Sequence, residues 1–300
     1  MTLPAVSLAA MPGRRRATLD VAKELERRGF QGIYCASFGD ALGLCLSLAH
    51  ETSRIRFGTA IANIYTRTPQ DMGQSAAYIH ELSGGRFTLG LGVSHAPVNQ
   101  RLGVETGKPL SDMRAYVEKV RAGEKQWGTL PPVVLASLRR RMVSLAAEIG
   151  DGAVFANAAR SHMQESLSQI PVERRTADFF VGNMIPTCID DDRAAAAAVN
   201  RKTLTGYLML PNYRNYWREA GYPEEMDAVE AALANGRRDE LPSLMSERWL
   251  ADTTLFGSVA EVRAGLEAWR AAGVGTPIVV PSSTRGGQMK AFEELLAAFA

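Results

Sequence analysis

The segment SGGRFTLGLGV, residues 83–93, links a predicted helix to a predicted strand and decides the class of fold. Gly84 and Gly85 follow an amphipathic stretch over 69–82 and end the helix that this stretch predicts. The run over 86–93 is nearly continuous in apolar residues, which is typical of a parallel strand buried on both faces. A helix that leads into such a strand within a few residues indicates a β/α unit.

The same alternation extends to both ends of the chain. Similar apolar runs predict strands near 4–9, 32–37, 55–62, 86–93, 132–137, 152–156, 178–185 and 277–281. Amphipathic stretches predict helices near 18–28, with Thr18 as a cap, and near 41–52, 69–82, 111–124, 139–149, 161–169 and 190–208. Eight strands with helical crossovers favour an α/β fold of the (β/α)8 TIM barrel type. The alternative is an open doubly wound sheet, but its glycine-rich turn is missing from residues 9–18, which hold one glycine.

The length of the chain predicts one barrel with an elaborated rim. Its 300 residues exceed by roughly 50 the about 250 of a typical eight-fold barrel. The surplus maps mainly onto a helical block near 205–255, between the seventh and eighth strands, and partly onto the loop over 95–110. No low-complexity linker divides the chain, so we expect a single domain over residues 1–300 with the block as an insertion on the catalytic rim.

The composition excludes several classes of protein. Lys and Arg number 34 against 32 Asp and Glu, so the net charge of +2 offers no basic surface for nucleic acid or anionic membranes. No apolar run approaches the roughly 18 residues of a membrane span, and no signal peptide is expected. Cys35, Cys45 and Cys188 are too few for a disulfide framework and lack metal-ligand spacing. We therefore expect reduced thiols, no metal and a cytoplasmic enzyme.

Polar side chains follow the predicted strands at their carboxyl ends, where barrel enzymes carry their active sites. These positions are Ser37, Asp40, Asn63, His95, Ser137, Asn157 and Ser283. One histidine and one carboxylate are too few for a zinc hydrolase or for glycoside cleavage, and no lysine at a strand end provides a Schiff base. A polar but thinly charged set suits a large, flat cofactor that carries the difficult chemistry itself.

These segments resemble the luciferase-like flavin and deazaflavin oxidoreductases over nearly the whole chain. The resemblance is carried by SGGRFTLGLGV (83–93), FGTAIANIY (57–65), Gly257-Ser258 and AAGV (271–274). Within that superfamily, the branch from actinobacteria that uses coenzyme F420 is similar at IANIY (61–65), GVSH (92–95) and LPNY (210–213). The resemblance implies an oxidoreductase that moves hydride between F420 and a small organic substrate, and a homodimer.

The resemblance also implies which residues meet the cofactor. In F420 members a bulge in the third strand, often with a non-prolyl cis peptide, backs the central ring; that position falls on Ala60, Ile61 and Ala62 here. Further cofactor contacts are implied for Asn63, Ser94, Ser137, Leu138 and Asn157, of which the last three would hold the phosphate and ribityl part.

Two other functions remain open. The first is an FMN-dependent monooxygenase that a partner reductase supplies with reduced flavin. The second is a protein that binds a deazaflavin without turning it over, which the sparse set of acids and bases allows. Ser37 and Phe38 stand where better-known members of the superfamily carry a histidine or glutamate, so an acid–base mechanism does not transfer directly.

Single residues also leave alternatives. His95 is the candidate for proton transfer, since its loop follows the fourth strand, but it could be a hydrogen-bonded loop histidine. Asp40 could contact the ring, although its position favours a helix N-cap. Asn63 could reach the cofactor or satisfy its own bulged backbone. Tyr213 and Trp217 could line the substrate cavity, while their helical spacing favours packing.

Overall fold

The computed structural model describes residues 2–37 and 39–300, so Phe38 lies outside the described residues. The chain divides into two compact units. The first comprises the chain up to Val154 together with Gln169–Gly182, and the second comprises Phe155–Ser168 and Asn183–Ala300. Each unit is described below by itself, and the single domain remains a prediction.

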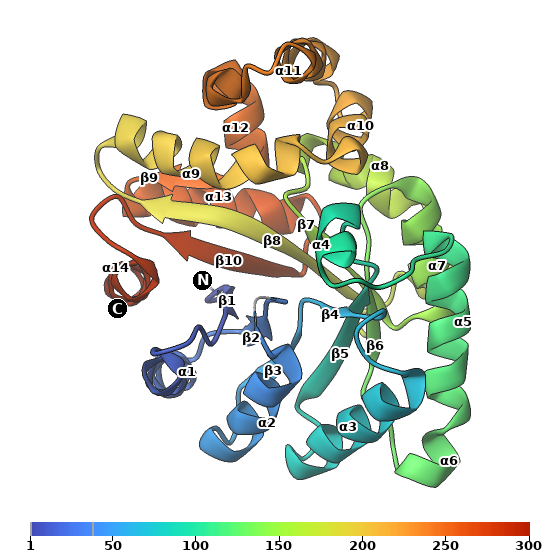
Figure 1. The fold of residues 1–300 in the computed structure, drawn as a ribbon. Coiled ribbons are helices and arrows are strands. Elements are labelled where there is room, and N and C mark those ends of the chain that lie inside the picture. Colours follow the sequence, from blue (N-terminus) through green and yellow to red (C-terminus); the bar gives the residue numbers. More distant parts are fainter. Residues whose placement is uncertain (1, 38) are drawn as a thin grey trace. The chain divides into compact units, whose positions relative to one another are not determined.

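The first unit is a parallel sheet with helices along one side (Figure 1). Its strands are β1 (Ala5–Leu8), β2 (Gly32–Cys35), β3 (Arg56–Thr59), β4 (Ala62–Asn63), β5 (Phe87–Gly92), β6 (Val133–Ala136) and the start of β7 (Gly152–Ala156). Its helices are α1 (Arg15–Arg28), α2 (Ala41–Glu51), α3 (Pro69–Leu82), α4 (Ala96–Arg101), α5 (Pro109–Ala122), α6 (Glu124–Trp127), α7 (Arg140–Ile149) and the 3-10 turn η2 (Val172–Arg174). The sheet pairs β1 with β2, β2 with β3, β3 and β4 with β5, β5 with β6, and β6 with β7.

The third predicted strand is interrupted by a bulge. Gly58 pairs with Thr88, and the next pair joins Ala62 to Leu91. Three residues on one strand therefore face two on the other, which is the extra residue of a β-bulge. The peptide bond between Ala60 and Ile61 inside this bulge is cis. Bulge and cis peptide thus lie where the resemblance placed them.

Gly90 and Gly92 make room for the bulge on the neighbouring strand. A Cβ atom on Gly90 would lie 2.0 Å from the backbone oxygen of Thr59, and one on Gly92 would lie 2.6 Å from Cγ1 of Ile61. The Thr59 hydroxyl also replaces part of the backbone ladder: it donates to the Gly90 oxygen (2.7 Å) and accepts from the Gly90 nitrogen (2.9 Å). Gly90 therefore permits close approach of two backbones, and Gly92 leaves room for the Ile61 side chain.

Arg86, from the same segment, joins the ends of two helices to the sheet. Its guanidinium donates to the backbone oxygens of Ser83, Ala49, Thr52 and Ile55. These carbonyls belong to the last turns of α3 and α2 and to the loops that follow them, so one side chain satisfies several terminal acceptors. Burial lowers the pKa of Arg86, but the group remains charged at neutral pH.

The second unit holds the additional helices. Its strands are β8 (Phe180–Ile189), which starts in the first unit, β9 (Leu255–Gly257) and β10 (Thr276–Ser282). Its helices are η1 (Arg160–His162), α8 (Met163–Ser168), α9 (Arg193–Leu208), α10 (Pro211–Glu219), α11 (Pro223–Ala234), η3 (Arg238–Leu244), α12 (Glu247–Thr253), α13 (Val259–Ala271) and α14 (Gln288–Ala298). β8 pairs with both β9 and β10, and α9 runs along β8, with α10, α11 and α12 beyond it (Figure 1).

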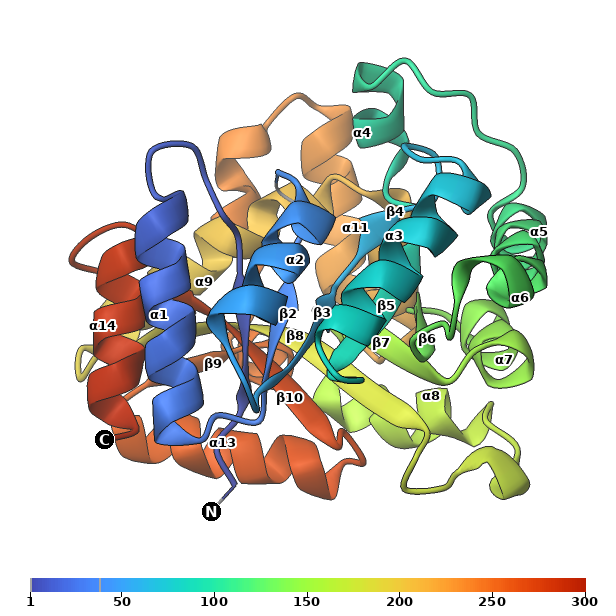
Figure 2. The same ribbon diagram turned by 90° about the horizontal axis from the view of Figure 1, so that it is seen from below.

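Several details differ from the sequence prediction. The helix expected near 18–28 begins at Arg15 and has Arg14 as its N-cap residue, so Thr18 is not its cap. The buried Thr18 hydroxyl donates to the backbone oxygen of Arg14, four residues earlier. The seventh predicted strand runs on to Ile189, because the apolar run continues past a proline. The sequence prediction also missed the short elements α4, α6 and β9 and the last helix, α14. Of these, α4 lies next to β4 in both views (Figure 1, Figure 2).

Three further findings concern membrane-spanning helices, metal sites and cysteines in the described residues. Among them, no helix has the length and apolar character needed to cross a bilayer. No group of three or more His, Cys, Asp or Glu side chains in the described ranges is placed to hold a metal ion. Cys35, Cys45 and Cys188 are buried free thiols.

We expect Gly90→Ala to destabilise the protein by about 1–3 kcal/mol, because the new methyl group would collide with a backbone oxygen that cannot swing away. The matched control is Gly206→Ala in α9, where a Cβ meets nothing within 4 Å and should stabilise the helix by about 0.5–1 kcal/mol. Urea unfolding measures both. Equal stability of the two variants would mean that the strands do not approach as described.

Candidate functional site

The carboxyl end of the sheet in the first unit brings the bulge against β5 and β6. A Cβ on Gly92 would touch the Ile61 side chain and lie 3.1 Å from Cβ of Ala136, so these three positions meet on one face. Ile61 and Ala136 are partly exposed, whereas Ala60 and Ala62 are buried. Ala62 shares a face with Leu91, opposite to Gly92, because side chains alternate along a strand. Ile61 is therefore the residue of the bulge that offers an apolar surface here.

Ser94 and His95 follow β5 directly. Ser94 has a left-handed backbone (φ 55°), and the His95 backbone oxygen accepts from the nitrogens of Val98 and Asn99 at the start of α4. Both Ser94 and His95 are partly exposed. Burial lowers the pKa of His95 below its usual 6.5, so the imidazole is neutral at pH 7. A neutral imidazole in a partly exposed loop can accept a proton from a bound molecule.

Asn63 lies beside this loop and is buried. Its Nδ2 donates to Oδ1 of Asn99 (2.9 Å), and its Oδ1 accepts from the nitrogen of Tyr65 (3.1 Å). Both ends of the carboxamide are thus engaged within the protein, and one bond serves the backbone just after the bulge.

Ser137 and Leu138 follow β6. The buried Ser137 hydroxyl donates to the Leu135 oxygen (3.1 Å), and the Ser137 nitrogen donates to the Val154 oxygen (2.9 Å). Leu138 is partly exposed. Of this pair, only Leu138 presents an accessible side chain.

Asp40 confirms the helix-cap prediction. Its Oδ1 accepts from the Gly43 nitrogen (3.0 Å) at the start of α2. Arg67 Nη2 lies 3.7 Å from the same carboxylate, in an exposed ion pair that contributes little stability. Ser37 is exposed, and Phe38 lies outside the described residues.

Asn157, in the second unit, is enclosed by the helical insertion. It is 3% exposed and has a left-handed backbone (φ 54°). Its backbone nitrogen donates to the Met184 oxygen (3.0 Å), and its backbone oxygen accepts from Nε1 of Trp217 (3.2 Å). Its side chain hydrogen-bonds with Tyr207 and Tyr213, whose pKa values are raised by burial despite this contact. Its backbone is therefore held within its own unit, whereas its side-chain nitrogen Nδ2 is buried and finds no hydrogen-bond partner among the described residues.

Tyr213 and Trp217 belong to a buried aromatic cluster in the second unit. Ring centroids lie 5.0 Å apart for Tyr207 and Tyr213, 5.3 Å for Tyr213 and Trp217, and 4.8 Å for Trp217 and Trp249. Tyr213 and Trp217 are 4% and 0% exposed. Packing within the insertion, the alternative that their helical spacing favoured, accounts for both side chains.

Asp252 is a buried carboxylate that the sequence did not single out. It accepts from the Ser161 nitrogen (2.9 Å), the Ser161 hydroxyl (2.6 Å) and the Tyr222 hydroxyl (2.8 Å). The Ala159 nitrogen adds a bond to the Tyr216 hydroxyl (3.0 Å). Several helices of the insertion thus hold the loop after β7. The bonded residues lie 57 to 91 positions apart in the chain, so no local sequence pattern predicts these contacts.

Asp190 marks the carboxyl end of β8 and was missed because the predicted strand ended at residue 185. Its carboxylate accepts from the Thr284 hydroxyl and from the Asp192 nitrogen, and both bonds lower its pKa. After β10, the Ser283 hydroxyl donates to Glu294 (3.0 Å), which also pairs with Arg285. This end of the second unit is polar, and Oε2 of Glu294 is buried there without a hydrogen-bond partner in the part of the chain that the structure describes.

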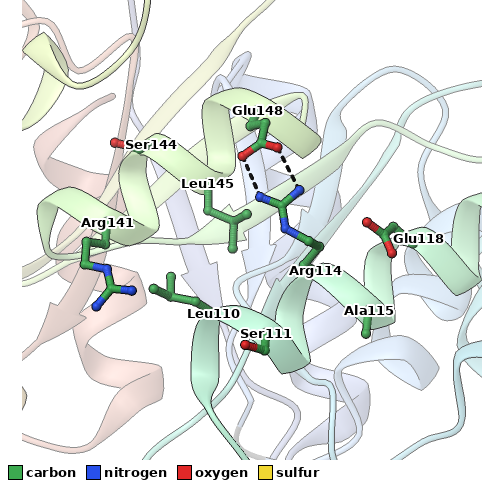
Figure 3. Close-up of a pocket in the computed structure, with 9 residues that line it drawn as sticks. All are labelled: Leu110, Ser111, Arg114, Ala115, Glu118, Arg141, Ser144, Leu145 and Glu148. Carbon is green, nitrogen blue, oxygen red and sulfur yellow. Dashed lines mark hydrogen bonds and ion pairs between the residues drawn. The ribbon is translucent and has the colours of Figure 1, made fainter.

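A groove of about 510 Å³ lies elsewhere in the first unit, between α5 and α7 (Figure 3). Arg114 from α5 reaches the Glu148 carboxylate of α7 with two bonds of 2.7 and 2.5 Å across it. No predicted site residue lines this groove, whose walls are Leu110, Ser111, Arg114, Ala115, Glu118, Arg141, Ser144, Leu145 and Glu148. We therefore do not take this groove as the candidate site.

Residues 1–276 match the sequence profile of the luciferase-like monooxygenases. The chain belongs to this family. A provisionally named coenzyme F420-dependent oxidoreductase of Mycobacterium tuberculosis is 28% identical over 323 aligned positions, which cover 91% of this chain and 92% of that protein. These findings make the chain an oxidoreductase of the luciferase-like class.

Solved structures of similar fold extend over the whole chain. The coenzyme F420-dependent tetrahydromethanopterin reductase from Methanopyrus kandleri superposes with a TM-score of 0.78 at 18% identity, covering 99% of this chain and 98% of that one. The FMN complex of 3,6-diketocamphane monooxygenase from Pseudomonas putida gives a TM-score of 0.61 at 16% identity, covering 98% and 97%. The predicted luciferase-like (β/α)8 TIM barrel is confirmed, and the cofactor class is deazaflavin or flavin.

We expect His95 to make the protein less stable in mild acid. The folded protein disfavours the protonated ring, so below pH 6.5 the unfolded chain binds more protons than the folded one. Stability therefore falls as the pH drops from 6.5 toward the folded pKa. Urea unfolding between about pH 5 and 7 should show this slope in the native protein and a shallower slope in His95→Gln. An unchanged slope would contradict the burial of His95.

Proposed function

We propose that this oxidoreductase transfers hydride between coenzyme F420 and a small organic substrate. The observation that carries the proposal is the bulge between Gly58 and Ala62, where three residues face two residues of β5. The resemblance assigns such a bulge to the F420 members of the superfamily, where it backs the deazaflavin ring. The name of the mycobacterial relative supports the same cofactor.

The residues of the first unit fit a flat ring at the bulge. Ile61 is a partly exposed apolar side chain next to glycine and alanine positions, so it would back the ring without competing for its polar edge. Ser94 and Leu138 are the other predicted contacts with accessible surface. Asn63 and Ser137 are hydrogen-bonded within the first unit and would support the site through the backbone. Asn157 is the predicted contact that belongs to the second unit.

The chain's own chemistry centres on His95. Bound F420 supplies two-electron hydride transfer, which removes the need for a reactive protein nucleophile. Hydride transfer to or from a carbonyl or alcohol carbon leaves one proton to be moved at the neighbouring oxygen. The neutral His95 imidazole would accept that proton during oxidation of an alcohol and return it in the reverse direction.

An FMN-dependent monooxygenase is the second candidate function. The family profile and the FMN complex of 3,6-diketocamphane monooxygenase favour it. A monooxygenase would need reduced flavin from a partner reductase and would consume oxygen. The third candidate function is a protein that carries a deazaflavin without turning it over. It is supported by the small number of acids and bases among the predicted site residues, which include one histidine, His95.

We expect F420 to bind at least about tenfold more tightly than FMN. Ultrafiltration followed by absorbance of the free cofactor measures both affinities. Ile61→Trp should abolish F420 binding because the indole would occupy the space of the ring, whereas Val172→Trp, at a position 77% exposed, should leave it unchanged. Tighter binding of FMN would select the second candidate function, and retained F420 binding by Ile61→Trp would move the ring away from the bulge.

We expect His95→Ala to lower turnover by about 10²–10⁴-fold while changing F420 affinity by less than about threefold. The control is His50→Ala, which removes an exposed histidine from α2. Loss of reduced F420 absorbance against a panel of ketones and aldehydes reports turnover. Full activity of His95→Ala would remove the proton-transfer role, and absence of turnover in the native protein with every carbonyl would favour the carrier.

A further inference from the structure

Two buried asparagine side chains join the loops that follow β4 and β5. Asn63 is 8% exposed and Asn99 is 4% exposed. Nδ2 of Asn63 donates to Oδ1 of Asn99 at 2.9 Å. Asn63 comes directly after the bulge, while Asn99 lies in α4, four residues beyond His95. The contact therefore spans the two loops that carry the candidate cofactor platform and the candidate proton-transfer group.

The pair belongs to a directed chain of hydrogen bonds. The Tyr65 nitrogen donates to Oδ1 of Asn63, Asn63 donates to Asn99, and Nδ2 of Asn99 donates to the Val93 oxygen (2.9 Å). Donors and acceptors alternate from one backbone to the other. Turning either carboxamide over would place two like groups face to face, so each amide fixes the orientation of the other.

Asn99 also closes the short segment that contains His95. Its side chain holds the Val93 oxygen, and its backbone nitrogen donates to the His95 oxygen (3.0 Å). Ser94, with its left-handed backbone, lies between these two carbonyl groups. One residue therefore fixes both ends of the turn from which the His95 side chain projects.

A second contact joins the same loops further out. The Tyr65 hydroxyl donates to Oδ2 of Asp112 (2.6 Å), and the Gly107 nitrogen donates to the same oxygen (2.8 Å). Burial and the neighbouring carboxylate raise the pKa of Tyr65, so its hydroxyl stays a donor at any physiological pH. The loop from β5 to α5 is thus attached to the bulge loop near its start and near its end.

We propose that Asn63 and Asn99 are positioning residues that hold His95 in its place beside the bulge. Neither carboxamide has to touch the cofactor for this role, because both act through the backbone of residues 93–95. The inference rests on the proposed function only in taking His95 as the proton-transfer group. The claim that the Asn63–Asn99 bond sets the surroundings of His95 does not depend on which cofactor binds.

The test is histidine ring NMR of the free protein, with the His95 signal assigned through His95→Gln. In Asn99→Ala and in Asn63→Ala we expect the His95 pKa to rise by about half a unit or more, as the loosened turn exposes the ring to water. The matched control is Asn200→Ala. That residue is equally buried and donates to the Leu255 oxygen (2.9 Å), but lies in α9 of the second unit.

A general loss of stability would affect the control as well, whereas the positioning role predicts a His95 shift in the first two variants alone. Asn99→Asp adds a further comparison, since it keeps the acceptor for Asn63 and loses the donor to Val93; its His95 resonance should also move. A His95 titration that matches the native protein in Asn63→Ala and Asn99→Ala overturns the inference.

A parallel F420 titration separates the two proposals. If the native protein does not bind F420, the proposed function fails while the NMR result still decides the positioning role. If the native protein binds F420, we expect Asn99→Ala to retain affinity within about threefold and to lose turnover about tenfold or more, with Asn200→Ala unchanged in both. Native turnover in Asn99→Ala would overturn the inference and leave the proposed function intact.

Discussion

The close approach of β5 to the bulged third strand is the constraint on which the rest of the first unit depends. A side chain at Gly90 would occupy the place of a backbone oxygen, and one at Gly92 would displace Ile61. With glycine at both positions, three residues of the bulged strand can face two residues of β5. The Thr59 hydroxyl can then bond to the Gly90 backbone and fill the gap in the hydrogen bonds between the strands. The apolar platform at Ile61 is a direct result, since the extra residue turns that side chain over Gly92.

Behind this platform, most polar groups bind one another. Asn63 and Ser137 were expected to meet the cofactor, yet their side chains bind partners within the first unit. Such an arrangement suits an enzyme whose cofactor brings the reactivity, because the protein then has to supply a rigid surface and a single titratable group. His95, whose pKa is lowered by burial, is the titratable group that meets this need.

The sequence predicted the elements well where local signals were strong. Gly29 and the glycine pair at residues 84–85 end helices with left-handed backbones, as their residue type predicts. The bulge was placed through the family resemblance. Asp252 and the Asn63–Asn99 bond were not foreseen, since hydrogen bonds between residues 36 or 91 positions apart depend on the folded topology. The short helix α4 was missed because six residues are too few to establish a period.

The attachment of the loop after β7 to the insertion has a consequence for local motion. Trp217, Tyr216 and Asp252 supply the partners for that loop's backbone, so the loop cannot detach without leaving buried groups unsatisfied. Loop and insertion should therefore open and close together as one cooperative segment, with matching rates of amide hydrogen exchange. A substitution in the outer helices would then alter the backbone contacts at the end of β7. The loop after β7 and the insertion would therefore have to change together in evolution.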